Sequence, residues 1–196
     1  MSKMFLINKI SDYSTGIQES FCFLFPMEIL FEGFIGGFLQ EAIRDVSGKV
    51  YLQKSDMNLV DDIQYKGESL GSALKMKHDI LVEIGSKIFI LDTKYKGISR
   101  FGDNPENIRK IVSEEPNQGD VYQVCEYARK RNITDVYLLY PMYRHENVET
   151  DFPKAVSKGC DRDINIHFIR LPFIFEENEN NIKDQLKLVI KQIFSL

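Results

Sequence analysis

The chain has 196 residues, of which 43% are hydrophobic and 12% aromatic, so it is long enough to bury one core of ordinary size. Its formal net charge of -4 argues against sequence-independent adhesion to nucleic acid, since such adhesion depends on lysines and arginines that neutralise phosphates. No apolar run is long enough to suggest a membrane span, and three widely separated cysteines indicate neither a zinc site nor a disulfide framework. These features favour a cytoplasmic protein.

The N-terminal segment over residues 1–22 shows no periodic pattern, and we expect one globular domain over 23–196. Within that domain, Pro26 can occupy the first turn of a helix, and apolar side chains follow it at helical spacing. The pattern predicts an amphipathic helix over about 26–45. A Ser-Gly pair at 47–48 ends this helix, and the apolar residues after the pair favour a strand.

Two apolar runs, over 74–84 and 87–95, flank a Gly-Ser pair. Two strand-like runs joined in this way predict an antiparallel β-hairpin. The polar segment over 97–119 is long for a structureless connection. It predicts a mobile or substrate-facing loop that contains one short helix near 107–112.

The second half of the chain predicts two helices and two strands. Helical periodicity covers 120–130, a strand covers 136–140 until Pro141 stops it, a second strand covers 164–173, and an amphipathic helix covers 180–194. Helices and strands in this order indicate an α/β protein.

The predicted hairpin carries the residues that point to chemistry. Side chains alternate between the two faces of a strand, so Asp92 and Lys94 project to the same side. Asp79 lies in the preceding strand, close enough along the hairpin for both carboxylates to meet across neighbouring strands. The apolar run over 88–91 is typical of a buried strand, so charges at its end cost free energy unless they are paired or ligated.

Two converging aspartates repel each other unless a cation or a proton lies between them, and Mg²⁺ favours such oxygen ligands. Phosphodiester hydrolysis needs a polarised phosphate, an activated water and a stabilised leaving oxygen, and metal ions can supply all three. A lysine beside the phosphate can position water or neutralise developing charge. Asp79, Asp92 and Lys94 therefore predict hydrolysis that depends on Mg²⁺, with Mn²⁺ as a substitute. A solvated edge pair of Asp and Lys is the structural alternative.

Two further elements fit the same site. Gln123 and Tyr127 share one face of the helix expected after the hairpin, where they can orient a DNA phosphate or a water, although an ordinary polar helix face fits equally. Glu28 and Glu32 lie one turn apart on the first helix. We expect Glu32, close to the apolar stripe, to add a metal ligand and Glu28 to face solvent.

The sequence resembles the McrC family, the nuclease subunit of McrBC-type modification-dependent restriction systems, over about residues 23–175. The resemblance rests on Phe23 to Met27 with Leu30 to Glu32, on Asp79 with Ile90 to Lys96, on Asp120 to Gln123 with Tyr127 to Ala128, and on Tyr137 to Pro141. It implies a restriction-endonuclease-like core of the PD-(D/E)XK type, with a mixed central sheet flanked by helices. His78 stands where the motif name has proline, and we expect it to face solvent.

The resemblance also implies roles for individual residues. Asp79 and Asp92 are the implied metal ligands together with Thr93 and Glu32, Lys94 is the implied catalytic lysine, and Gln123 and Tyr127 form the implied QxxxY element. The implied substrate is double-stranded DNA, and the implied partner is an McrB-like AAA+ GTPase. The family typically carries an additional N-terminal region that engages this partner, and little precedes Phe21 here.

Several alternatives stay open from the sequence alone. The chain could be a catalytically inactive nuclease-fold module that docks onto or activates the AAA+ partner, or a metal-dependent hydrolase of another phosphate ester. The sequence also does not decide whether a nuclease of this kind forms a homodimer to cut both strands.

Overall fold

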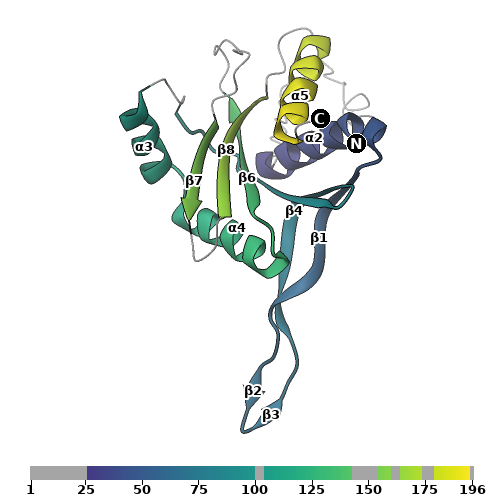
Figure 1. Ribbon diagram of the computed structural model, residues 1–196, viewed down its shortest axis with the longest axis vertical. Coiled ribbons are helices and arrows are strands. Elements are labelled where there is room, and N and C mark those ends of the chain that lie inside the picture. Colours follow the sequence, from purple (N-terminus) through teal and green to yellow (C-terminus); the bar gives the residue numbers. More distant parts are fainter. Residues whose placement is uncertain (1–25, 100–103, 143–153, 160–163, 174–178, 195–196) are drawn as a thin grey trace, which may run out of the picture.

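A computed structural model describes residues 26–99, 104–142, 154–159, 164–173 and 179–194. Its centre is a mixed six-stranded sheet with the strand order β1-β4-β5-β6-β8-β7 (Figure 1). The strands are β1 (Lys49–Val60), β4 (Ala73–Ile84), β5 (Lys87–Thr93), β6 (Asp135–Met142), β7 (Lys154–Gly159) and β8 (Ile164–Pro172). Strands β5, β6 and β8 run parallel to one another, and the other neighbouring pairs are antiparallel.

Helices cover both faces of this sheet. The core on one face includes side chains from α2 (Met27–Ala42) and α5 (Glu179–Phe194), and the core on the other face includes side chains from α3 (Pro105–Glu114) and α4 (Gln118–Arg131). The predicted α/β class, with a mixed sheet flanked by helices, is confirmed. No helix in the described ranges is long and apolar enough to cross a membrane.

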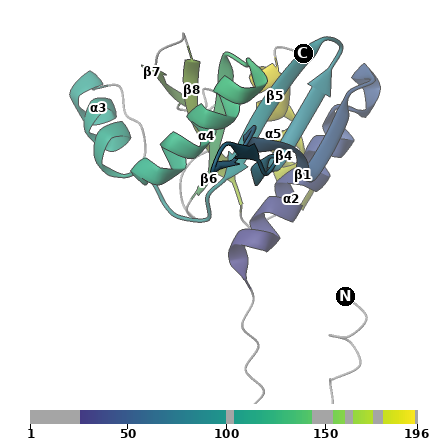
Figure 2. The same cartoon turned by 90° about the horizontal axis from the view of Figure 1, so that it is seen from below.

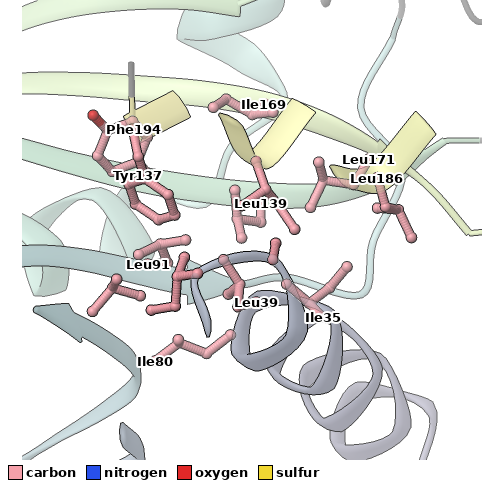
Figure 3. Close-up of a cluster of buried hydrophobic side chains, with 14 of the residues drawn as sticks. Ile35, Leu39, Ile80, Leu91, Tyr137, Leu139, Ile169, Leu171, Leu186 and Phe194 are labelled. Carbon is pink, nitrogen blue, oxygen red and sulfur yellow. The ribbon is translucent and has the colours of Figure 1, made fainter. Parts of the chain in front are cut away.

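The amphipathic pattern of the first helix determines how it packs. Phe31, Ile35 and Leu39 recur at four-residue spacing and are almost completely buried against the sheet and α5. Figure 3 shows Ile35 and Leu39 in this cluster. Burial of each such side chain contributes roughly 1.5–3 kcal/mol. The helix ends at Ala42 and a short 3-10 turn, η1 (Arg44–Val46), follows before Ser47 adopts a left-handed conformation.

The predicted antiparallel hairpin is confirmed as β4 and β5, which pair with Ile80 opposite Leu91. Gly85 occupies the turn with a φ of 59°, a conformation that glycine adopts without a steric penalty. The backbone N–H of Lys94 donates to the carbonyl of Leu139 at 2.8 Å, so the chain stays bonded to β6 just beyond the end of β5.

Pro141 does not stop its strand, contrary to the prediction. Strand β6 continues to Met142 because β8 pairs with it along its whole length, with Leu171 opposite Pro141. Strand β5 ends at Thr93, opposite Leu139, so β6 has a single neighbour at the proline. Proline is tolerated at such an edge because the missing N–H has no partner to lose.

Two features were not predicted from the sequence, β7 at the edge of the sheet and a long arm. Strands β1 and β4 continue beyond the sheet as a two-stranded ribbon, hereafter the arm, over residues 54–77 (Figures 1 and 2). A small second sheet forms its tip from β2 (Gln64–Tyr65) and β3 (Glu68–Ser69). The segment that joins β1 to β4 is therefore an ordered hairpin.

Ion pairs hold the arm against the C-terminal end of α4. Arg131 pairs with Asp56, and Lys130 pairs with Asp61. Both cations come from the last turn of the helix, and both acids come from the arm. Helix α4 therefore contacts the arm at one end and, as described next, the candidate site at the other.

Candidate functional site

The two predicted aspartates lie on neighbouring strands. Strands β4 and β5 pair in antiparallel register with Ile80 opposite Leu91, and the same register continued by one residue places Asp79 opposite Asp92. The side chain of Asp92 is buried, with the whole residue 1% exposed, whereas Asp79 is partly exposed. The hairpin therefore brings the two carboxylates together at the edge of the buried core.

Lys94 lies beside this pair. Its Nζ is 2.6 Å from Oδ2 of Asp92 and 3.5 Å from Oδ1 of Asp120. The prediction that Asp92 and Lys94 project to the same side is confirmed. The ammonium is half-buried between two carboxylates that come from different elements, strand β5 and the first turn of α4.

Burial gives Asp92 unusual electrostatics. Loss of hydration, together with the neighbouring charge of Asp79, raises the pKa of Asp92 to about 7, although Lys94 acts in the opposite direction. Burial alone would lower the pKa of Lys94, but Asp92 and Asp120 outweigh it and raise that pKa. Oδ1 of Asp92 is buried and has no hydrogen-bond partner among the described residues. The contacts of Asp92 thus do not offset the free-energy cost of burying its charge, and further positive charge nearby would stabilise the carboxylate.

Thr93 orients the other aspartate. Oδ2 of Asp79 accepts hydrogen bonds from the backbone N–H of Thr93 at 3.0 Å and from its hydroxyl at 3.1 Å. The side chain of Thr93, a residue that the resemblance implies as a metal ligand, is therefore engaged by Asp79.

The structure does not bring Glu32 into the aspartate pair as a third acid. Glu32 is half-buried on α2 and accepts a hydrogen bond from the side-chain amide of Gln53 on β1. Burial raises the pKa of Glu32, and the charge of Asp79 raises it further, so the two carboxylates interact electrostatically. Across the described ranges, no group of three His, Cys, Asp or Glu side chains is placed to hold a metal ion. Glu28 is exposed, as predicted.

Gln123 and Tyr127 share one face of α4, as predicted, and they act on β4. The Gln123 amide donates to the Tyr127 hydroxyl at 2.9 Å, and this hydroxyl donates to the carbonyl of Lys77 at 3.1 Å. Lys77 precedes Asp79 by two positions in the same strand. The pair therefore fixes the backbone that carries Asp79.

His78 does not face solvent, and the prediction that it does is wrong. The residue is 1% exposed, because α4 covers β4 at this position. Its ring packs edge-on against Tyr127 with centroids 4.6 Å apart, and Nε of Arg131 donates to its Nε2 at 2.7 Å. Burial and the charge of Arg131 lower the pKa of His78 to about 4, so the imidazole is neutral at neutral pH.

Asp120 is a site residue that the residue-by-residue reading missed. It pairs with Lys94 at 3.5 Å and with Lys96 at 2.7 Å. Its place in the first helical turn suits an anion, since the N-terminus of a helix carries partial positive charge. A signal was present in the sequence, because Asp120, Gln123 and Tyr127 are spaced to share one helix face.

Tyr140 is a second residue that the sequence reading missed. It is completely buried on β6, and its hydroxyl has no hydrogen-bond partner among the described residues. Burial raises the pKa of Tyr140 above its ordinary value, and the nearby charges of Asp120 and Asp92 raise it further. A buried hydroxyl and a buried carboxylate oxygen thus both lack partners in the same part of the site.

Replacement of Tyr140 by phenylalanine is expected to raise the free energy of unfolding of the cation-free protein by about 1 kcal/mol. The change removes a buried hydroxyl whose desolvation no hydrogen bond offsets. Urea denaturation in a chelating buffer measures the difference. Tyr65→Phe is the control, because the side chain of Tyr65 is exposed on the arm and its hydroxyl is hydrated. A decrease in stability of Tyr140→Phe would contradict the reasoning.

In a chelating buffer, the contribution of Asp92 to stability is expected to fall as the pH rises. The folded-state pKa of Asp92, about 7, lies above its ordinary value of 3.8. The folded protein therefore binds more protons between these values, so the contribution is complete below the lower pKa and is lost as the pH rises through the higher one. The loss approaches about 1.4 kcal/mol per pH unit at most.

The measurement compares the unfolding free energy of the wild type and Asp92→Asn at several pH values between 4 and 8, roughly the interval that the two pKa values bracket. The difference between the two proteins is expected to favour the variant increasingly as the pH rises. Glu126→Gln is the matched control, since the side chain of Glu126 is 43% exposed on α4 and pairs with Arg129 at 3.3 Å. A difference that does not change with pH would show that Asp92 ionises normally.

The family model of the McrBC 5-methylcytosine restriction system component matches residues 1–141. One chain of a solved structure is similar in fold, with a TM-score of 0.53 and 16% sequence identity. That structure is a refined half-complex from a tetradecameric assembly of Thermococcus gammatolerans McrB AAA+ hexamers with bound McrC. No curated protein matches the chain.

The extent of each match determines what it shows. The structural match covers 85% of this chain and 33% of the other, so this chain spans about a third of the length of its structural relative. At this identity the likeness shows the fold, in agreement with the sheet and helices described above. The family model covers well over half of the chain. The chain therefore belongs to the McrC family, the McrBC 5-methylcytosine restriction system components.

Proposed function

We propose that the protein is a Mg²⁺-dependent DNA endonuclease, the nuclease component of a modification-dependent restriction system. The observation that carries the proposal is the buried carboxylate of Asp92, which has one oxygen without a partner in the described part of the chain and lies opposite Asp79. A buried carboxylate with an unpartnered oxygen lowers the stability of the fold. Groups of this kind cluster at functional sites. Family membership points to the same chemistry.

The residues present fit a divalent cation. Asp79 and Asp92 would hold it, with the carbonyl of Thr93 as a further oxygen ligand, and waters would complete the coordination that Mg²⁺ prefers. The unpartnered oxygen of Asp92 is the specific observation in favour of this fit. When bound, a divalent cation supplies Lewis-acid polarisation of the phosphate and activation of the attacking water.

The remaining residues have separate tasks. The Lys94 ammonium is placed to neutralise charge that develops on the phosphate oxygens during hydrolysis. Thr93 holds Asp79 through two hydrogen bonds, which fixes the direction of its carboxylate. Gln123 and Tyr127 fix the backbone of β4 through the carbonyl of Lys77. The contacts of Thr93, Gln123 and Tyr127 keep Asp79 in place, and small displacements of such a residue can cost much activity.

We further propose that an McrB-like AAA+ GTPase partner delivers double-stranded DNA to this site. The net charge of -4 provides little general affinity for DNA, so a partner is needed to bind and move the substrate. The structural relative comes from a complex of McrB AAA+ hexamers with bound McrC. The description of the family names 5-methylcytosine, which suggests DNA with this modification as the substrate to test.

The test is cleavage of plasmid DNA that carries 5-methylcytosine by the chain together with its AAA+ partner, GTP and Mg²⁺. Cleavage is expected with Mg²⁺ or Mn²⁺ and none is expected in a chelating buffer. Equal cleavage by the Asp92→Ala and Lys94→Ala variants would exclude the assignment. Absence of both cleavage and cation binding, with the partner still bound, would instead favour a non-catalytic module that keeps the fold.

A further inference from the structure

Lys94 and a divalent cation would compete for the same carboxylate. Nζ of Lys94 is 2.6 Å from Oδ2 of Asp92, so the ammonium lies against the same carboxylate whose other oxygen, Oδ1, is proposed to bind the cation. Two positive charges on the two oxygens of one buried carboxylate repel each other, and the low local dielectric constant strengthens this repulsion. Binding of the cation therefore favours movement of the ammonium away from Asp92.

Asp120 is a second carboxylate that the Lys94 ammonium can contact. Its Oδ1 is 3.5 Å from Nζ of Lys94, slightly beyond the distance of a close ion pair. Its other oxygen, Oδ2, is already bonded to Lys96 at 2.7 Å, so the oxygen that faces Lys94 is the one not engaged by Lys96. A shift of about 1 Å along the flexible lysine stem would convert the loose contact into a close one.

Both partners of this exchange are firmly attached to the fold. The backbone of Lys94 is held by its N–H bond to the carbonyl of Leu139, so only the side chain needs to move. Asp120 lies in the first turn of α4, where the Asn117 side chain caps the helix by accepting from the N–H of Gly119 at 2.8 Å. The next turn carries Val124, which is completely buried.

We propose that Asp120 is a positioning residue that receives the Lys94 ammonium when a divalent cation binds at Asp92. This inference rests on the proposed function, since it assumes a cation at the aspartate pair. Asp120 lowers the cost of displacing Lys94 and keeps the ammonium within the site, next to the place where phosphate would bind. Lys96 neutralises the other oxygen of Asp120, which disfavours capture of the cation by Asp120 itself.

The experiment is calorimetric titration of the full chain with Mn²⁺. Asp120→Asn is expected to weaken Mn²⁺ binding about tenfold, because Lys94 then has only Asp92 as a partner and competes more strongly for it. In a Lys94→Met background the same substitution is expected to change the affinity less than about twofold, because no ammonium needs a new partner. Asp120→Glu, which keeps the carboxylate, is expected to restore most of the affinity.

The background comparison separates positioning from a direct role. Tenfold weakening that persists in the Lys94→Met background would overturn the inference, since Asp120 would then act as a ligand or through its charge alone. Equal affinity of Asp120→Asn and the wild type would overturn it as well. Glu126→Gln, which removes one carboxylate from the surface of the same helix, is the charge-matched control and is expected to leave the affinity unchanged.

Failure of the proposed function gives a different result. A wild-type chain that binds no Mn²⁺ would contradict the proposed cation site itself. Thermal unfolding of each variant in a chelating buffer verifies that the chain is folded, and the Asp120→Glu variant keeps the test open if Asp120→Asn is unstable.

Discussion

Asp92→Asn is expected to lower the rate of Mg²⁺-dependent DNA cleavage by about a thousandfold or more. The substitution removes the negative charge of the buried carboxylate that is proposed to hold the cation, and loss of cation catalysis costs several kcal/mol of transition-state stabilisation. The side chain keeps its size, so the core around β5 should remain intact. Single-turnover cleavage with the AAA+ partner present measures the rate.

The same substitution is expected to stabilise the cation-free protein at neutral pH. The amide avoids the cost of ionising a carboxyl group whose pKa is about 7 in the fold. Loss of activity together with a gain in stability would identify Asp92 as a residue kept for function. A variant that keeps the cleavage rate of the wild type would remove Asp92 from the proposed chemistry. Glu126→Gln, on the surface of α4, is expected to change neither quantity.

Lys94→Met is expected to lower the cleavage rate by roughly a hundredfold to a thousandfold, the range typical for removal of one group that stabilises transition-state charge. The unbranched methionine keeps most of the aliphatic stem. At the same time, the affinity for Mn²⁺ is expected to rise, because no ammonium competes for Asp92 at 2.6 Å. Slower cleavage together with tighter Mn²⁺ binding is the combination that competition between Lys94 and the cation predicts.

Two measurements check the Lys94 prediction. Single-turnover cleavage gives the rate of the chemical step, and calorimetry gives the affinity for Mn²⁺. Lys110→Met is the control, since Lys110 is exposed on α3. If Lys94→Met lost both cleavage and cation binding, Lys94 would be needed to build the site, and the proposed competition with the cation would be wrong.

The positions of Asp79, Asp92 and Lys94 could be predicted from the sequence because they depend on rules that act between residues close in the chain. Alternation along a strand places Asp92 and Lys94 on one side, and a short turn fixes the antiparallel register that brings Asp79 opposite Asp92. Both rules act within a single hairpin. The amphipathic helices at 27–42 and 179–194 followed from local periodicity in the same way.

The wrong predictions for His78 and Pro141, and the failure to identify Tyr140, have one cause. The positions of these residues depend on contacts between segments that are distant in the sequence. His78 is buried because α4 covers β4, and nothing around His78 in the sequence indicates that cover. Tyr140 reaches the site because β6 pairs in parallel with β5, a crossover that spans the intervening helices. Pro141 remains in its strand because β8 supports it from one side. Pairing of this kind is set by the whole fold, so local patterns cannot reveal it.

Helix α4 has 14 residues, so it is a rod of about 21 Å. Its first ten residues carry Asp120, Gln123 and Tyr127, and its last turn holds the arm through Lys130 and Arg131. A stiff rod cannot tilt at one end alone. A force on the tip of the arm that tilts the C-terminal end of α4 would therefore also move Gln123 and Tyr127. Because these two side chains hold the backbone of β4, the same force would shift Asp79 relative to Asp92.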